Sequence, residues 1–214
     1  MEKDLKSTYN QIAEDWSKEH VQDESWWKDA ADKFISLLPS GGTVLDVGCG
    51  PGIKSRYLIS KGLKVVGIDF SEKMVEIAGR KASGGDFRVV DIYKLEDVPE
   101  KFDGIFAHAI LLHIPKKNVP AILQNTKDKL KNGGYLYVAV KEAKSDHPEE
   151  EVLKESDYGY EYERFFSYFS MVEIKKYLAE LNMEICFEAI TSYNKNNWVQ
   201  VIARRQTATS EPSV

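Results

Sequence analysis

The sequence predicts an α/β protein built on a doubly wound sheet. Short apolar runs of strand length alternate with segments of helical period, which is typical of repeated strand–helix–strand units with parallel strands. The first run leads into three glycines at alternate positions, and the next two runs end in an aspartate. Because the carboxyl ends of parallel strands meet at one edge of a sheet, we expect a small-molecule site at that edge.

Two helices are expected before the sheet, within residues 3–38. Apolar residues recur at helical spacing from Tyr9 to Trp16 and again from Trp27 to Leu38, so each set forms one stripe. The Pro-Ser-Gly-Gly stretch at 39–42 ends the second helix. The repeating part then comprises strands 43–47, 64–68, 86–90, 102–108 and 134–140 and helices 52–61, 71–82 and 118–130.

The last part of the chain predicts one helix and a pair of strands. Ser170 and Glu173 form a capping box that opens a helix over 171–181. Strands over 183–191 and 196–204 are joined by a polar turn. We expect a single domain over 1–205, divided into N-terminal helices at 1–40, a ligand-binding core at 43–140 and an insertion at 141–170, and then a disordered tail at 206–214.

Residues 44–52 read VLDVGCGPG and predict a turn that brings bare backbone close to a ligand. Glycine has no Cβ to obstruct a ligand, and the helix that follows directs its free N–H groups at the same place. Gly48 and Gly50 fit the dinucleotide fingerprint G-x-G-x-x-G, but its third glycine would fall on Ile53. The third glycine is Gly52 instead, and Asp46 stands two residues before the first.

The second strand of the repeating part ends in an acidic residue. Asp69 lies 21 residues after Gly48, which is the usual spacing for a carboxylate that binds ribose hydroxyls. Phe70 beside it offers a face for an adenine ring, and Ser71 is a suitable N-cap for the next helix. The two strand ends together predict a nucleoside-like ligand.

On these residues the chain resembles the class I S-adenosylmethionine-dependent methyltransferases of the small, single-domain kind. The first motif of that family is an acidic residue followed by G-x-G-x-G, and the four matching motifs cover residues 44–114, about a third of the chain. The resemblance implies a Rossmann-like seven-stranded sheet with an antiparallel last strand. It also implies S-adenosylmethionine as cofactor and a small-molecule methyl acceptor.

The resemblance also assigns cofactor-binding residues. Asp46 would serve the cationic side of the cofactor, Asp69 the ribose, and Asp91, after the third strand, the adenine amino group. A fourth family motif, F-D-x-[IV]-x-x-x-x-x-[LI]-x-H, is matched at residues 102–113. For Met74, ordinary helix core is an equal alternative. The expected cofactor-binding set is Tyr9, Asp46, Gly48, Gly50, Gly52, Asp69, Phe70, Met74, Asp91, Ile92 and Ala107.

Two further roles follow from the resemblance. Tyr9, Ala13 and Trp16 resemble the helical lid of related enzymes, so Tyr9 is expected to reach the cofactor or the substrate; the alternative is a helix that simply packs on the sheet. His113 and His108 follow the fourth strand and are the candidate general bases. The alternative for His113 is a structural bond to a loop carbonyl, and methyl transfer from a sulfonium needs no obligatory base.

The segment 141–169 is long for a connection and is rich in acids and aromatics. In related enzymes this region forms the substrate wall, and residues 164–168 resemble the family stretch R-[YF]-F-x-Y. Such a wall suits a small, partly apolar acceptor in which a cationic group is tolerated or preferred. The alternative is a solvated loop anchored by its aromatics. The expected substrate-binding residues are Tyr160, Arg164, Phe166 and Tyr168.

Composition limits the possible partners. The net charge is −5 and no basic stripe is visible, so we expect no nucleic-acid partner. Two cysteines and four histidines show no zinc spacing, so we expect no metal and a reducing, cytoplasmic location. The polar N-terminus does not resemble a signal peptide, and no apolar run has membrane-spanning length.

Two other functions stay open at this stage. One is a methyltransferase that acts on RNA or protein, although residues 107–110 lack the (Asp/Asn)-Pro-Pro-aromatic run that binds a target nitrogen. The other is a non-catalytic module that binds S-adenosylmethionine, which would lack a second opening near the sulfonium.

Overall fold

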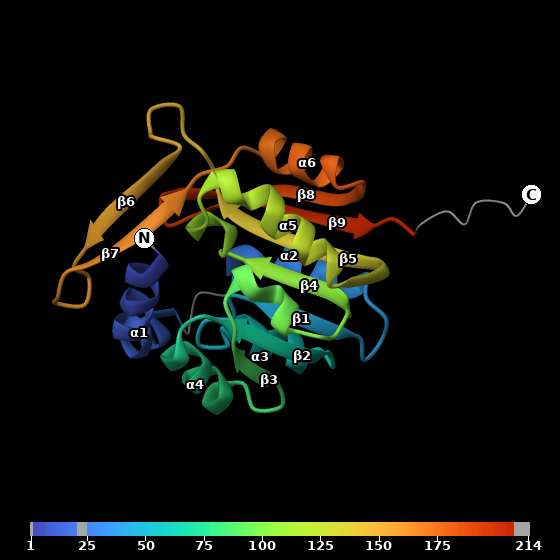
Figure 1. The fold of residues 1–214 in the computed structure, drawn as a ribbon, viewed down its shortest axis with the longest axis horizontal. Helices are drawn as coiled ribbons and strands as arrows, with labels where there is room; N and C mark the ends of the chain where they lie inside the picture. Colours follow the sequence, from blue (N-terminus) through green and yellow to red (C-terminus); the bar gives the residue numbers. More distant parts are fainter. Residues whose placement is uncertain (1, 21–24, 208–214) are drawn as a thin grey trace, which may run out of the picture.

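The computed structural model describes residues 2–20 and 25–207, and its main feature is one seven-stranded sheet with helices on both faces (Figure 1). The strand order is β3-β2-β1-β4-β5-β9-β8. The α-helices are α1 (Glu2–Glu19), α2 (Ser25–Ser36), α3 (Ile53–Ser60), α4 (Glu72–Lys81), α5 (Val119–Asp128) and α6 (Met171–Glu180). The strands are β1 (Thr43–Val47), β2 (Lys64–Asp69), β3 (Asp86–Val89), β4 (Phe102–His108), β5 (Leu130–Lys141), β6 (Glu150–Glu155), β7 (Tyr162–Ser167), β8 (Met183–Tyr193) and β9 (Asn196–Arg205).

The direction of the strands confirms the predicted fold class. Strands β1 to β5 run parallel, and the last strand, β9, pairs antiparallel with β5 on one side and β8 on the other. The hairpin between β8 and β9 turns at Asn194 and Lys195, both with positive φ, as a tight polar turn requires. The carboxyl ends of β1, β2, β4 and β5 therefore meet at one edge.

Apolar residues cover both faces of the central strands, as expected for a parallel sheet between two helix layers. Leu45 packs in the cluster that includes α5 and α6, whereas its neighbour Val44 packs in the cluster that includes α2 and α3. Both side chains are fully buried. The alternation of faces along β1 thus places its backbone ends, and the turn after it, rigidly at the sheet edge.

Two elements differ from the prediction. Strand β5 begins at Leu130 rather than at residue 134, because a register shift pairs Phe102 with Leu130 but Gly104 with Tyr135. The segment 141–169 contains an antiparallel hairpin of β6 and β7 rather than a loop without regular structure. In β7 the inward positions Tyr162, Arg164 and Phe166 alternate with more exposed ones, which is the period of a strand covered on one side. Short 3-10 helices lie at Ile92–Asp97 (η2), Leu111–His113 (η3) and Lys116–Asn118 (η4).

Candidate active site

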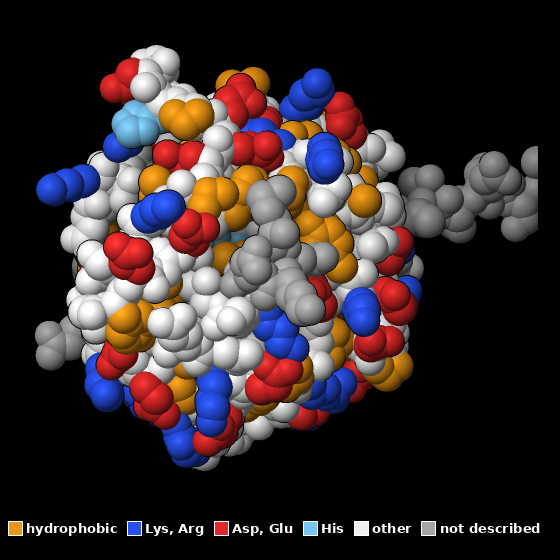
Figure 2. All heavy atoms as spheres, turned by 60° about the vertical axis from the view of Figure 1, so that its left-hand side comes forward, with side chains coloured by type: hydrophobic (Ala, Val, Ile, Leu, Met, Phe, Trp, Pro, Cys, Tyr) orange, Lys and Arg blue, Asp and Glu red, His pale blue; other side chains and the backbone are white. Residues whose placement is uncertain are grey.

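A cavity of about 740 Å³ lies at the carboxyl edge of the sheet, covered by α1 and the β6–β7 hairpin. This volume is within the range of about 300–1,000 Å³ that is usual for small-molecule sites. Figure 2 shows hydrophobic side chains gathered near the middle of this side of the molecule, with charged side chains around them. The ends of the strands, the 3-10 helices and the hairpin all contribute residues to the walls of this cavity.

The glycine turn after β1 forms one wall. The N–H groups of Gly48 and Cys49 both donate to the carbonyl of Ile68 at the end of β2, 2.8 and 2.9 Å away. Gly48 has φ +70°, and a Cβ there would lie 2.8 Å from the side chain of Ile110. Gly50 has φ +51° and nothing within 4 Å of a Cβ. Packing therefore excludes a side chain at Gly48, whereas the space beside Gly50 belongs to the cavity.

Gly52 has a different place from the other two glycines. It caps α3 with φ +80°, and its Cβ position faces Ala78 of α4 rather than the cavity. Ala107, in β4, is 3% exposed and packs in the core below the cavity wall. These two predicted cofactor residues therefore support the site from behind and do not line it.

Two buried carboxylates stand at the ends of β1 and β2. Asp46 is 2% exposed and accepts a hydrogen bond of 2.5 Å from the Ser55 hydroxyl. Asp69 is 8% exposed and accepts from the N–H groups of Gly50 and Ser71, at 3.0 and 2.9 Å. Burial raises the pKa of both carboxyl groups to about 6, against these hydrogen bonds. Asp69 thus fixes the glycine turn as well as facing the cavity.

The predicted adenine-side residues lie together on the wall beyond β2. Phe70, Met74, Asp91 and Ile92 all line the cavity. Met74 is 1% exposed and also packs under α1, so its roles as core residue and as wall residue coexist. One carboxylate oxygen of Asp91 accepts from the N–H of Tyr93 at 3.0 Å. This part of the wall is therefore apolar, with the Asp91 carboxylate as its polar group.

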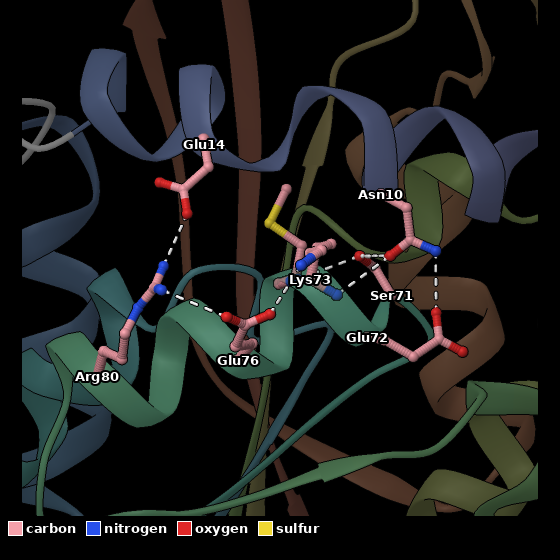
Figure 3. A network of polar contacts seen from close by, with 8 residues as sticks. Asn10, Glu14, Ser71, Glu72, Lys73, Glu76 and Arg80 are labelled. Carbon is pink, nitrogen blue, oxygen red and sulfur yellow. Dashed lines mark hydrogen bonds and ion pairs between the residues drawn. The ribbon is translucent and has the colours of Figure 1, made fainter.

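Helix α1 is held over the cavity by polar contacts to α4 (Figure 3). The Asn10 amide oxygen accepts from the Ser71 hydroxyl and the Lys73 N–H, and its nitrogen donates to Glu72. One turn further, Glu14 pairs with Arg80, which also contacts Glu76. These contacts place Tyr9 on the inner face of α1, at the cavity wall.

His113 is engaged through both of its ring nitrogens. Its Nδ1 lies 2.7 Å from the carbonyl oxygen of Phe165, which can only accept, and its Nε2 lies 2.7 Å from the hydroxyl of Tyr9. The Tyr9 hydroxyl therefore donates to Nε2. Burial lowers the pKa of His113 to about 3, so the ring is neutral at pH 7. The carbonyl bond expected as the structural role is present, and the ring also lines the cavity.

His108 lies in a different part of the same cavity. It is 9% exposed, and its ring is nearly parallel to those of Phe106 and Trp198, with centroids 5.9 and 6.1 Å away. Burial lowers its pKa, so this ring too is neutral. The two histidines that looked alike in the sequence thus face different surroundings, one against α1 and one against aromatic rings.

The four predicted substrate-binding residues separate into two pairs. Arg164 and Phe166 line the cavity from β7, and Arg164 forms a bidentate pair with Glu155 of β6. Tyr160 and Tyr168 are not on the cavity wall. The Tyr160 hydroxyl contacts Asp15 of α1 and that of Tyr168 donates to Glu151, so both hold the hairpin in place. The structure thus places Tyr160 and Tyr168 outside the cavity wall.

Comparison with known proteins finds a methyltransferase domain within the chain. Residues 44–134 match a family model described as a methyltransferase domain. The matched residues begin at β1 and include the glycine turn, Asp69 and Asp91, so they hold most of the cofactor-side wall of the cavity.

Curated relatives match about half of the chain. The ubiquinone biosynthesis O-methyltransferase of Dechloromonas aromatica is 34% identical over 119 residues, which are 52% of this chain and 48% of that protein. Phosphoethanolamine N-methyltransferase 1 of Triticum aestivum is 36% identical over 117 residues, 52% of this chain and 23% of that protein. The chain spans about half the length, or less, of the curated relatives it matches.

Solved structures share the whole fold. The 1,6-didemethyltoxoflavin-N1-methyltransferase of Burkholderia thailandensis superposes with a TM-score of 0.74 at 18% identity, covering 94% of this chain and 87% of its own. A methyltransferase from Methanosarcina mazei gives 0.70 at 22% identity, covering 80% and 96%. At these identities the likeness establishes the fold.

Several residues of the cavity wall were not predicted from the sequence. Trp26 of α2, Lys141 at the end of β5 and Trp198 of β9 all line the cavity. A lysine directly after a buried parallel strand is a signal that could have been read, because such ends meet at the site edge. The two tryptophans carry no local motif. In the described residues no group of three His, Cys, Asp or Glu could hold a metal ion, and none of the described helices could cross a membrane.

The raised pKa values of Asp46 and Asp69 predict that cofactor affinity falls in acid. A ligand that needs both carboxylates charged must displace their protons below pH 6, so the apparent dissociation constant rises as pH falls. We expect affinity for S-adenosylhomocysteine to drop by about tenfold or more between pH 7.5 and 5.0, since one group with pKa 6 alone gives that factor. Calorimetry across this range measures it, with Asp69→Asn giving a shallower dependence; a flat profile in the unmodified protein would contradict it.

Proposed function

We propose that this protein transfers a methyl group from S-adenosylmethionine to a small-molecule acceptor by direct displacement. The main support for this proposal is a single covered cavity with two different walls, one from the strand ends of the sheet and one from the β6–β7 hairpin. Its first wall is the glycine turn with Asp46 and Asp69, and its second is formed by Arg164 and Phe166 of the hairpin. A cofactor on the first wall leaves room for an acceptor against the second.

On this proposal, the strand ends bind and orient the cofactor. The Asp69 carboxylate accepts from the ribose hydroxyls, and Phe70, Met74 and Ile92 enclose the adenine with Asp91 at its amino group. Asp46 lies near the cationic end, and the N–H groups at the start of α3 favour a carboxylate there. When bound, the cofactor supplies an activated methyl group, so the protein's main tasks are to position the acceptor and exclude water.

A proton acceptor is available if the acceptor atom carries a proton. His113 is neutral, and its Nε2 lone pair is directed at Tyr9, so it would take a proton through the Tyr9 hydroxyl or after Tyr9 moves. His108 is neutral as well and stands at the aromatic part of the wall. We propose that α1 acts as a lid, because the Tyr9 hydroxyl joins this helix to His113.

A small acceptor is favoured over RNA or protein. The cavity lies beneath α1 and the hairpin, which are joined by the Thr8 hydroxyl donating to the Glu163 carbonyl and by Tyr158 donating to Glu19. A macromolecule would have to break these contacts to reach the site. The names of the curated relatives, a ubiquinone biosynthesis enzyme and a phosphoethanolamine enzyme, support small acceptors.

The test of this function uses S-adenosylmethionine carrying a labelled methyl group. The protein is incubated with it and with separate small-molecule, RNA and protein fractions of a cell extract, and labelled products are identified by mass spectrometry. We expect label in the small-molecule fraction. Label only in RNA or protein would favour the second methyltransferase hypothesis, and cofactor binding without label in any fraction would favour a non-catalytic module.

The cavity wall predicts different kinetic effects for substitutions at Phe166, in β7, and at Tyr168, just after β7. Phe166→Leu should raise the acceptor KM several-fold, because the ring is 2% exposed, faces the cavity and contacts His113 at 5.0 Å. Tyr168→Leu is the control, since that ring lies behind Phe166 and off the wall. Steady-state kinetics with the identified acceptor measure both. Equal effects on acceptor KM and on cofactor affinity would show that Phe166 is only core.

A further inference from the structure

The cavity has an aromatic end that the cofactor-binding residues do not use. Trp26 of α2 contacts three rings there: Trp198 at 4.3 Å, His108 at 5.0 Å and Tyr193 at 5.6 Å between centroids. All four line the cavity. They come from α2, β4, β8 and β9, so this end lies on the β5–β9–β8 side of the sheet, away from β2 and β3.

Two hydrogen-bond donors at this end have no acceptor. The Nε1–H groups of Trp26 and Trp198 are the two buried side-chain polar groups without a partner in the described part of the chain. The residues are only 7% and 9% exposed, so solvent does not satisfy these donors. An indole N–H can only donate, and leaving it unpaired in a buried place costs free energy. A ligand with acceptor atoms would remove that cost.

A lysine lies on the neighbouring strand, opposite one of these tryptophans. Lys141 is directly opposite Trp198 in the antiparallel register of β5 and β9, so the two side chains leave the same face of the sheet. The Lys141 ammonium lies 4.1 Å from the centre of the Phe166 ring, and within the described residues no ion pair joins it to a carboxylate. Burial lowers its pKa to about 8, so it is still mostly charged at pH 7.

The nearby acids are already engaged. Glu155 is held by the bidentate pair with Arg164, and Glu151 accepts from the Tyr168 hydroxyl. Of these two acids only Glu155 lines the cavity, and the Arg164 guanidinium balances its charge. Lys141 gives this end a positive charge, and in the described part of the chain it forms no ion pair with a carboxylate.

We propose that the aromatic end binds an anionic group of the methyl acceptor, in the simplest case the carboxylate of a planar ring, through the Lys141 ammonium and the indole N–H groups of Trp26 and Trp198. The proposal rests on the proposed function, because it names the class of acceptor for that same cavity. The rings supply flat apolar walls, and the three donors supply charge-assisted hydrogen bonds. It replaces the expectation of a cationic acceptor.

The cofactor's own carboxylate is a competing occupant, and the topology weighs against it. Lys141 ends β5, which is two strands from β1 in the sheet order. Neighbouring strands are about 4.8 Å apart. The backbone of Lys141 in β5 is therefore about 10 Å from β1, the strand that leads into the glycine turn. A measurement of cofactor affinity distinguishes the two occupants directly.

The test uses the full chain saturated with S-adenosylhomocysteine and two probes of matched shape, 2-naphthoate and the neutral 2-naphthamide. Calorimetry should give at least tenfold tighter binding of the carboxylate than of the amide. Lys141→Met should weaken carboxylate binding at least tenfold, leave the amide unchanged and leave affinity for S-adenosylhomocysteine unchanged. Trp198→Phe, which keeps a ring but removes the N–H, should weaken carboxylate binding while the amide still binds.

The matched control is Lys144→Met. Lys144 follows Lys141 by three residues, is exposed, and donates to the Lys195 carbonyl. This variant should bind both probes as the unmodified protein does. A general effect of removing one positive charge near the hairpin would appear in both lysine variants.

Each other outcome overturns a stated claim. Equal binding of the two probes, or binding of neither, while S-adenosylhomocysteine binds, overturns the anionic-acceptor proposal and leaves the proposed function intact. Loss of S-adenosylhomocysteine affinity in Lys141→Met assigns the lysine to the cofactor and overturns the proposal as well. Failure of the unmodified protein to bind S-adenosylhomocysteine overturns the proposed function itself.

Discussion

Replacing Gly50 with valine should abolish cofactor binding, with at least a 100-fold loss of affinity for S-adenosylhomocysteine. A Cβ at this position meets nothing within 4 Å, so the new side chain fills the space that the ligand needs. The backbone has φ +51°, which costs a β-branched residue about 1–3 kcal/mol of folding free energy. Calorimetry for affinity and thermal unfolding for stability measure the two effects separately.

Gly62→Val is the matched control for this variant. Gly62 also has positive φ, +85°, and open space around its Cβ position, but it lies in the turn after α3 and does not line the cavity. It should lose similar stability and keep its affinity for S-adenosylhomocysteine. Normal binding by Gly50→Val would contradict the placement of the cofactor against this turn.

Asp69→Asn should weaken cofactor binding by about 2 kcal/mol or more, which is about 30-fold, because ribose hydroxyls lose a charged acceptor. The structure adds a second effect that sequence reasoning did not include. Asp69 also accepts from the N–H groups of Gly50 and Ser71, so the glycine turn itself loses support. We therefore expect a fall in melting temperature together with the loss of affinity.

Asp103→Asn separates the two effects. Asp103 is a carboxylate that also accepts a backbone N–H, from Thr43, and it pairs with Lys131 at the opposite edge of the sheet. This variant should lose stability without losing affinity for S-adenosylhomocysteine. If Asp69→Asn lost only stability, and its affinity matched that of Asp103→Asn, the second strand end would have no direct part in binding.

The cofactor-side wall could be predicted because its residues are local in the sequence. Asp46, Gly48 and Gly50 lie at or just after the end of one strand, and Asp69 and Phe70 lie at the end of the next, so strand order alone brings them together. The sequence pattern alone could not show that the three glycines have different roles. Only the direction of each Cβ position shows that Gly50 faces the cavity while Gly52 faces α4.

The acceptor-side wall could not be predicted in the same way. Trp198 lies opposite Lys141 through the antiparallel register of β9, and Trp26 contacts Trp198 through the packing of α2. No fixed sequence spacing predicts either contact. Sequence analysis treated segment 141–169 as a long connection and did not predict the alternation of the β6–β7 hairpin. That period is what directs Arg164 and Phe166 inward.

The central claim is that one site at the carboxyl edge of the sheet holds S-adenosylmethionine. The most direct measurement is a calorimetric titration of the unmodified protein with S-adenosylmethionine, S-adenosylhomocysteine and NADH. The predicted result is one site per chain for the first two ligands, mutual competition between them, and no binding of NADH. Binding of NADH with no binding of either S-adenosyl compound would contradict the account.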